Sequence, residues 1–116
     1  MSKSSTTIRQ GPAPGVALKI RPVHPGEILA EELQELELSA NALAQALDVP
    51  TNRISDILRG RRSVTADTAL RLARYLGTTP ALWLNLQQNY DLAIAQKSVG
   101  AEIAKTVRPR KQRIAA

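Results

Sequence analysis

Apolar residues recur at spacings of three and four through the middle of the chain, which is the period of an α-helix. Short breaks made of glycine, proline and helix-capping residues divide residues 22–97 into five such segments. The first four apolar faces comprise Ile28, Leu29, Leu33 and Leu36, then Leu43, Ala44 and Leu47, then Ile54, Ile57 and Leu58, and finally Ala66, Ala69, Leu70, Ala73 and Leu76. The pattern predicts an all-α domain of five helices.

Residues typical of helix ends lie at the borders between these segments. Serine and threonine cap the first turn of a helix, proline is tolerated inside that turn, and glycine adopts the left-handed conformation that ends a helix. The predicted starts are Pro25–Gly26, Ser39, Pro50, Thr65 and Thr79–Pro80, and the predicted ends include Gly60 and Gly77. The fifth helix is expected to run to about Lys97.

Residues 39–59 form the most informative pair of segments. Two short amphipathic helices are joined by Asp48-Val49-Pro50, a link that allows only a sharp corner. The second helix turns its apolar side inward and leaves polar side chains outside. This layout predicts a helix-turn-helix, in which the second helix contacts base edges in the major groove of DNA.

The fifth segment is apolar over a wider arc than packing against its own domain requires. The surplus predicts a subunit interface on this helix, formed by Trp83, Leu86, Tyr90 and Ile94. A tryptophan at this spacing belongs either to the core or to such an interface. The chain is therefore expected to form a homodimer.

Composition excludes several classes of function. The 116 residues suffice for one small domain, and they contain no cysteine and a single histidine, His24. Without a partner histidine or cysteine, His24 is expected to cap or turn the chain and not to bind a metal. The chain shows no nucleophile elbow, paired histidine and carboxylate, or phosphate-binding loop, so neither an enzyme nor a cofactor or small-molecule ligand is expected. It also shows no secretory signal or membrane-spanning run, which predicts a cytoplasmic protein.

Charge is distributed unevenly around the net value of +6. Residues 1–21 carry +4 and are rich in serine, threonine, glycine and proline, which predicts a flexible arm. Residues 98–116 are expected to form a basic, disordered tail. Between them, residues 22–96 carry −3, with the glutamates in the first helix and the arginines after the helix-turn-helix corner. The acidic and the basic end of the domain predict two partners.

Four motifs in residues 21–96 resemble the Cro and phage-repressor (XRE) family, and within it the HigA antitoxins of bacterial toxin–antitoxin modules. They are Arg21–Leu29 (RPVHPGEIL), Ser55–Arg62 (SDILRGRR), Thr65–Ala73 (TADTALRLA) and Thr79–Gln87 (TPALWLNLQ). The helix-turn-helix pattern is shared by many regulators, whereas the HPGE start together with the TPxxWLxLQ segment is more specific. The resemblance implies a phage-repressor-like fold and a homodimer that binds an inverted repeat in its own promoter. It also implies neutralisation of a RelE-like toxin that cleaves mRNA on the ribosome.

The expected DNA-contacting residues lie on the predicted recognition helix and just after it. Asn52 and Arg53 suit bidentate contacts to adenine and guanine, and arginines after the helix suit phosphate oxygens. The full set is Ser39, Thr51, Asn52, Arg53, Asp56, Arg59, Arg61 and Arg62. Many members of the wider family have a phosphate-contacting glutamine where this chain has Ala40, so Ser39 or Asn41 has to replace that contact.

The glutamates of the first helix form either an ordinary solvated face or a surface for a basic partner. The second interpretation assigns toxin binding to Glu31, Glu32 and Glu35. Two other functions stay open at this point: a stand-alone XRE-type repressor without a toxin, and a protein-interaction module that keeps the fold without binding DNA.

Overall fold

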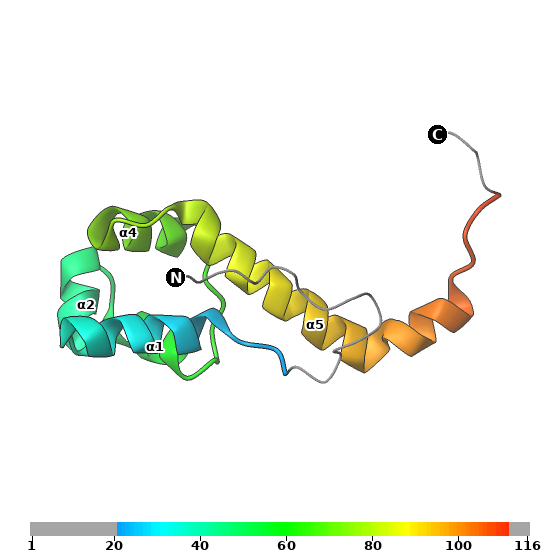
Figure 1. The fold of residues 1–116 in the computed structure, drawn as a ribbon, viewed down its shortest axis with the longest axis horizontal. Coiled ribbons are helices and arrows are strands. Elements are labelled where there is room, and N and C mark those ends of the chain that lie inside the picture. Colours follow the sequence, from blue (N-terminus) through cyan, green and yellow to red (C-terminus); the bar gives the residue numbers. More distant parts are fainter. Residues whose placement is uncertain (1–20, 112–116) are drawn as a thin grey trace, which may run out of the picture.

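The computed structural model describes residues 21–111, and within that range it contains five helices and no strand. The helices are α1 (Pro25–Leu36), α2 (Ala40–Leu47), α3 (Thr51–Leu58), α4 (Ala66–Leu76) and α5 (Pro80–Thr106). Figure 1 shows α1 to α4 gathered at one end, with α5 running away from them. The predicted all-α fold is confirmed. The predicted arm lies outside the described residues except for Arg21, as do the last five residues of the predicted tail.

The predicted capping residues are confirmed. The hydroxyl oxygens of Ser39, Thr65 and Thr79 each accept a hydrogen bond from the backbone N–H three residues ahead, at the starts of α2, α4 and α5. Gly77 ends α4 in the left-handed conformation, with φ of 79°. These bonds satisfy amide groups that have no partner inside the helix, so local sequence sets the helix boundaries.

α5 is longer than the sequence pattern indicates. It continues past Lys97 to Thr106, and Gly100 lies inside it, so the expected disorder is wrong for residues 98–106. A single glycine costs a helix only about 1 kcal/mol, and the residues after it are good helix formers. The helix ends three residues before Pro109, since proline disfavours helical backbone in the residue before it.

The core lies where the first four helices meet the start of α5. Its fully buried members include Leu29, Leu43, Ile54, Ile57 and Leu72. The predicted face of α4 was partly wrong, because Leu70 is 59% exposed while Leu72 is buried. Both sets of positions have helical spacing, so the period alone did not distinguish them. Leu36, at the end of the predicted α1 face, is also exposed.

The first turn of α1 packs directly against the end of α3. A Cβ atom added to Gly26 would lie 1.9 Å from the carbonyl oxygen of Ile57, so a side chain at this position has no space. The turn is held by a capping box: His24 Nδ1 accepts from the Gly26 N–H at 2.8 Å, and the Glu27 carboxylate accepts from the His24 N–H. The HPGE motif therefore anchors α1 to α3.

We expect Gly26→Ala to lower the free energy of unfolding by about 1–3 kcal/mol, because the methyl group forces α1 away from the α3 backbone. Urea unfolding followed by circular dichroism measures this. Gly100→Ala is the matched control, since a Cβ there meets only the Gln96 side chain, at 3.5 Å. The control should leave stability unchanged or raise it by up to about 1 kcal/mol. Equal losses in the two variants would contradict the close packing at Gly26.

Candidate nucleic-acid interface

The corner between α2 and α3 is closed by one left-handed residue and two hydrogen bonds. Asp48 adopts the left-handed conformation with φ of 61°, which aspartate tolerates better than most residues. The Val49 N–H then donates to the Ala44 carbonyl at 3.0 Å. At the start of α3 the Thr51 hydroxyl donates to Asn41 Oδ1 at 2.7 Å. These bonds tie α3 to the first turn of α2 and fix the orientation of α3.

The outward face of α3 carries Asn52, Asp56 and Arg59 in one line, because positions separated by four and three residues share a helix face. Ile54 and Ile57 are fully buried on the opposite side. Asn52 and Arg59 are exposed, and Asp56 is half-buried. The structure thus brings three of the predicted DNA-contacting residues together on one exposed ridge.

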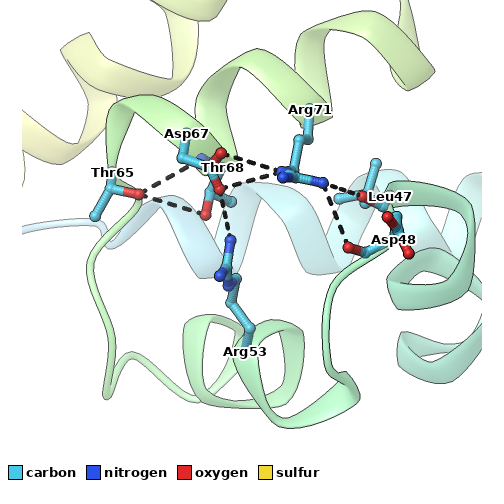
Figure 2. Close-up of polar contacts among 7 residues, drawn as sticks. All are labelled: Leu47, Asp48, Arg53, Thr65, Asp67, Thr68 and Arg71. Carbon is cyan, nitrogen blue, oxygen red and sulfur yellow. Dashed lines mark hydrogen bonds and ion pairs between the residues drawn. The ribbon is translucent and has the colours of Figure 1, made fainter.

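Arg53 lies at the edge of this face and points toward α4, as Figure 2 shows. Its Nη1 donates to Asp67 Oδ2 at 2.7 Å, and the side chain is 29% exposed. This ion pair was not predicted from the sequence, because the two residues are fourteen positions apart and only the packing of α3 against the start of α4 joins them.

Asp67 also holds Arg71, one turn further along α4. Arg71 Nε donates to both carboxylate oxygens of Asp67, and Arg71 Nη1 donates to the Leu47 carbonyl at 2.8 Å (Figure 2). That carbonyl belongs to the last turn of α2, where no partner exists inside the helix. The hydrogen bond from Arg53, followed by that from Arg71, lowers the pKa of the Asp67 carboxyl. The ionised Asp67 carboxylate therefore links α3 to α4 directly and, through Arg71, also to the end of α2.

A basic loop follows α3. Gly60 adopts a φ of 75°, and the Gly60 and Arg61 N–H groups donate to the carbonyls of Ile57 and Asp56, which completes a Schellman motif. The motif turns the chain so that Arg59, Arg61 and Arg62 are all exposed. Further on, the Val64 N–H donates to the buried Gln87 of α5 at 2.8 Å. The loop is therefore fixed at both ends.

Two of the remaining candidates are partly occupied by other contacts. Asp56 Oδ2 lies 3.7 Å from Arg62 Nη2. The arginine therefore offsets the negative charge of Asp56 on an otherwise basic face. Ser39 caps α2 through the Ala42 N–H and stays exposed, so its hydroxyl hydrogen is available to a phosphate oxygen. Asn41 accepts from Thr51, which leaves its amide N–H groups as the donors next to the α2 start.

His24 connects the start of α1 with α5. The imidazole is buried, caps α1, and packs edge-on against Tyr90, with ring centroids 4.8 Å apart. The predicted capping role is confirmed. Burial lowers the pKa of His24, and this outweighs the opposite effects of Asp91, Glu27 and the Arg62 backbone.

This pKa shift predicts that stability decreases below neutral pH. The unfolded chain takes up a proton on His24 near pH 6.5, whereas the folded chain does so only at a lower pH, so the free energy of unfolding falls between these two values. We expect urea unfolding to show a steeper loss from about pH 7.5 to about pH 5.5 in the native chain than in His24→Asn, which keeps a capping oxygen and does not titrate. Parallel curves would show that His24 has an unshifted pKa.

The structure separates the predicted interface residues of α5. Trp83 is 2% exposed in the core, and its Nε1 donates to Thr78 Oγ1 at 2.8 Å, so it has almost no surface left for a second subunit. Leu86 and Tyr90 are half-buried, and Ile94 is 40% exposed. Exposed apolar residues continue beyond Ile94 on a part of α5 that was expected to be disordered. They are Val99, Ile103 and Val107, the last at the end of the helix.

Acidic residues cluster on α1, away from the basic loop. Glu31, Glu32 and Glu35 line one shallow groove. Glu32 also borders a second groove whose floor is apolar and includes Leu36 and Tyr75, each 47% exposed. At the other end of α1, a bidentate ion pair with Arg21 lowers the pKa of Glu27 to about 2. The predicted acidic surface therefore borders exposed apolar side chains.

The described part of the chain offers no site of other kinds. Over residues 21–111, no cluster of three or more His, Asp or Glu side chains could hold a metal ion. In the same range no helix combines the length and the apolar character needed to cross a membrane.

These features define the class of protein as a helix-turn-helix domain of the DNA-binding type. They are the exposed face of α3, the corner before it and the basic loop after it. A helix-turn-helix family profile matches residues 29–83. Virulence-associated protein I of Dichelobacter nodosus is 55% identical over 76 residues, which cover 65% of this chain and 70% of that protein. Antitoxin HigA-1 of Vibrio cholerae is 40% identical over 92 residues, covering 78% and 86% of the two chains.

Similar solved structures identify the subfamily to which the chain belongs. An addiction module antidote protein of the HigA family from Coxiella burnetii is 60% identical, with a TM-score of 0.76, over 78% of this chain and 99% of that one. The Pseudomonas aeruginosa antitoxin HigA, solved with the higBA promoter, is 45% identical with the same TM-score and coverage. The chain belongs to the HigA-type antitoxins of the XRE helix-turn-helix family.

Proposed function

We propose that this protein is a cytoplasmic antitoxin that binds an inverted repeat in its own promoter, represses its operon and neutralises a RelE-like toxin. The observation that carries the DNA-binding part is the exposed ridge of α3 beside the fixed basic loop. The Pseudomonas aeruginosa relative solved with its promoter supports the same use of the fold.

In this proposal the start of α3 enters the major groove. The Asn52 amide donates to and accepts from an adenine edge, and Asp56 is available to accept from a cytosine amino group. Arg59, Arg61 and Arg62 neutralise phosphates next to the groove, which sets affinity without reading sequence. Ser39 at the start of α2 contributes a further phosphate contact, in place of the glutamine that Ala40 replaces.

Two copies joined through α5 present two α3 helices to successive major grooves, about 34 Å apart. The exposed apolar side chain of Ile94 supports this subunit interface, because it shares a face of α5 with Leu86 and Tyr90 and such side chains are costly to leave in water. Leu86 and Tyr90 border it from the domain side.

DNase footprinting on the upstream region of the chain's own gene, together with titration at several salt concentrations, tests the proposal. We expect Asn52→Ala to weaken operator binding by about 1–3 kcal/mol and to relax the preference at one base pair of each half-site. Arg62→Ala should weaken binding to all sequences and reduce the slope of log K against log salt by about 1. Protection of two half-sites by the native chain is expected.

The two substitutions serve as controls for each other. If Asn52→Ala leaves base preference intact, α3 is not the helix that reads the sequence. If the native chain shows no preference for its own promoter over random DNA, it is an interaction module with a helix-turn-helix fold.

The acidic surface of α1 is the proposed toxin-binding site. RNA-cleaving toxins are expected to be basic, and the glutamates border the apolar groove around Tyr75 at a distance from the basic loop. We expect replacing Glu31, Glu32 and Glu35 together by lysine to weaken toxin binding at least tenfold and to spare operator binding. Calorimetry with the co-expressed product of the adjacent gene measures the first effect, and gel shift measures the second. Unchanged toxin affinity would exclude this surface.

A stand-alone repressor is the alternative function. It predicts that no small basic protein copurifies with the chain when the adjacent gene is expressed with it. The DNA-binding results above are the same in both cases, so copurification alone decides between them.

A further inference from the structure

Arg53 and Asp67 form an ion pair at the edge of the proposed DNA-binding face. Arg53 lies in the first turn of α3, next to Asn52, and recognition helices contact bases mainly through such N-terminal residues. Only the Nη1 nitrogen of Arg53 is engaged, by Asp67 Oδ2 at 2.7 Å. Within residues 21–111 its Nε and Nη2 groups have no hydrogen-bond partner, so four of its five N–H donors stay available.

Asp67 is itself held in place from a second side. Both of its oxygens accept from Arg71 Nε, at 3.2 and 3.1 Å, and Arg71 is anchored to the Leu47 carbonyl at the end of α2. Arg71 thus restrains the Asp67 carboxylate independently of Arg53. The contacts run from the α2 backbone through Arg71 and Asp67 to Arg53, as Figure 2 shows.

We propose that Asp67 is a positioning residue for sequence recognition: it holds the Arg53 guanidinium at the edge of α3 so that its free N–H groups meet a guanine in the operator. This inference rests on the DNA-binding function proposed above. A guanidinium that is already oriented loses less rotamer freedom when it binds a base than one that samples solvent. Asp67 therefore contributes to specificity without touching DNA.

The same geometry also defines the opposite effect. If the ion pair withheld Arg53 from the operator, removing the carboxylate would release the arginine and sharpen base preference. If the ion pair only supported the fold, its removal would change stability and leave base preference unaltered. Removal of the Asp67 carboxylate therefore weakens, sharpens or leaves unaltered the base preference in the three cases, and one experiment distinguishes them.

The experiment compares the native chain with Asp67→Asn, Arg53→Gln and the double variant, as full-length proteins, on a panel of single-base-pair substitutions in the operator. The base pair at which Arg53→Gln loses preference identifies the Arg53 contact. At that base pair we expect Asp67→Asn to lose about tenfold of the preference. The double variant should lose no more preference than Arg53→Gln alone, because both substitutions remove the same contact.

Asp48→Asn is the matched control. It removes the same charge at the helix-turn-helix corner, tolerates the left-handed backbone and touches Arg53 in no way that the structure shows. Both Asp→Asn variants are expected to bind random DNA more tightly, since each removes a negative charge near phosphates. Only Asp67→Asn should change the preference at the Arg53 base pair, and Asp67→Glu should restore part of it.

Three results would overturn the proposal: a sharper preference in Asp67→Asn, an unaltered preference in a folded Asp67→Asn, or equal changes in Asp67→Asn and Asp48→Asn. Thermal unfolding of each variant establishes that it is folded at the assay temperature. Failure of the DNA-binding function itself has a different signature, because the native chain would then show no preference at any base pair.

Discussion

The contact between Gly26 and the Ile57 carbonyl is the constraint on which the remaining geometry depends. It allows the backbone of α1 to touch the end of α3, at a distance that no side chain permits. His24, two residues earlier, caps α1 and packs on Tyr90 of α5. The imidazole also lies next to Gly60, where the chain turns toward the exposed arginines. One close packing therefore sets the positions of α1, α3, the basic loop and α5 relative to one another.

Charged residues are held in different ways on the two sides of α3. Exposed ion pairs contribute little to stability, with a median of about 0–1 kcal/mol. The main effect of the ion pairs of Asp67 with Arg53 and Arg71 is therefore the orientation that they impose on the two arginine side chains. Asp67 joins Arg53 of α3 to Arg71 of α4 and, through Arg71, to the end of α2. On the other side, backbone hydrogen bonds fix the basic loop, whose arginine side chains are exposed. A side-chain ion pair thus orients the arginine proposed to read a base, whereas the arginines proposed to bind phosphates are positioned mainly by the loop backbone.

The separation of surfaces fits a protein with two kinds of macromolecular partner. The glutamates of α1 border an apolar groove, whereas the basic loop follows α3. α5 carries a third surface, because its second half projects beyond the domain with apolar side chains exposed (Figure 1). The surfaces proposed to bind DNA, the toxin and a second subunit therefore lie on different helices and share no residue.

The sequence by itself determined the starts of the five helices and the helix-turn-helix corner, though not the end of α5, because caps and corners depend on interactions between residues a few positions apart. It also predicted that the side chains of Asn52 and the loop arginines face outward, and these residues are exposed. Only the tertiary structure decided that Trp83 is buried, that Leu72 and not Leu70 faces the core, and that Arg53 pairs with Asp67. These outcomes depend on which helix faces meet in space, and a single helix period is compatible with several such faces.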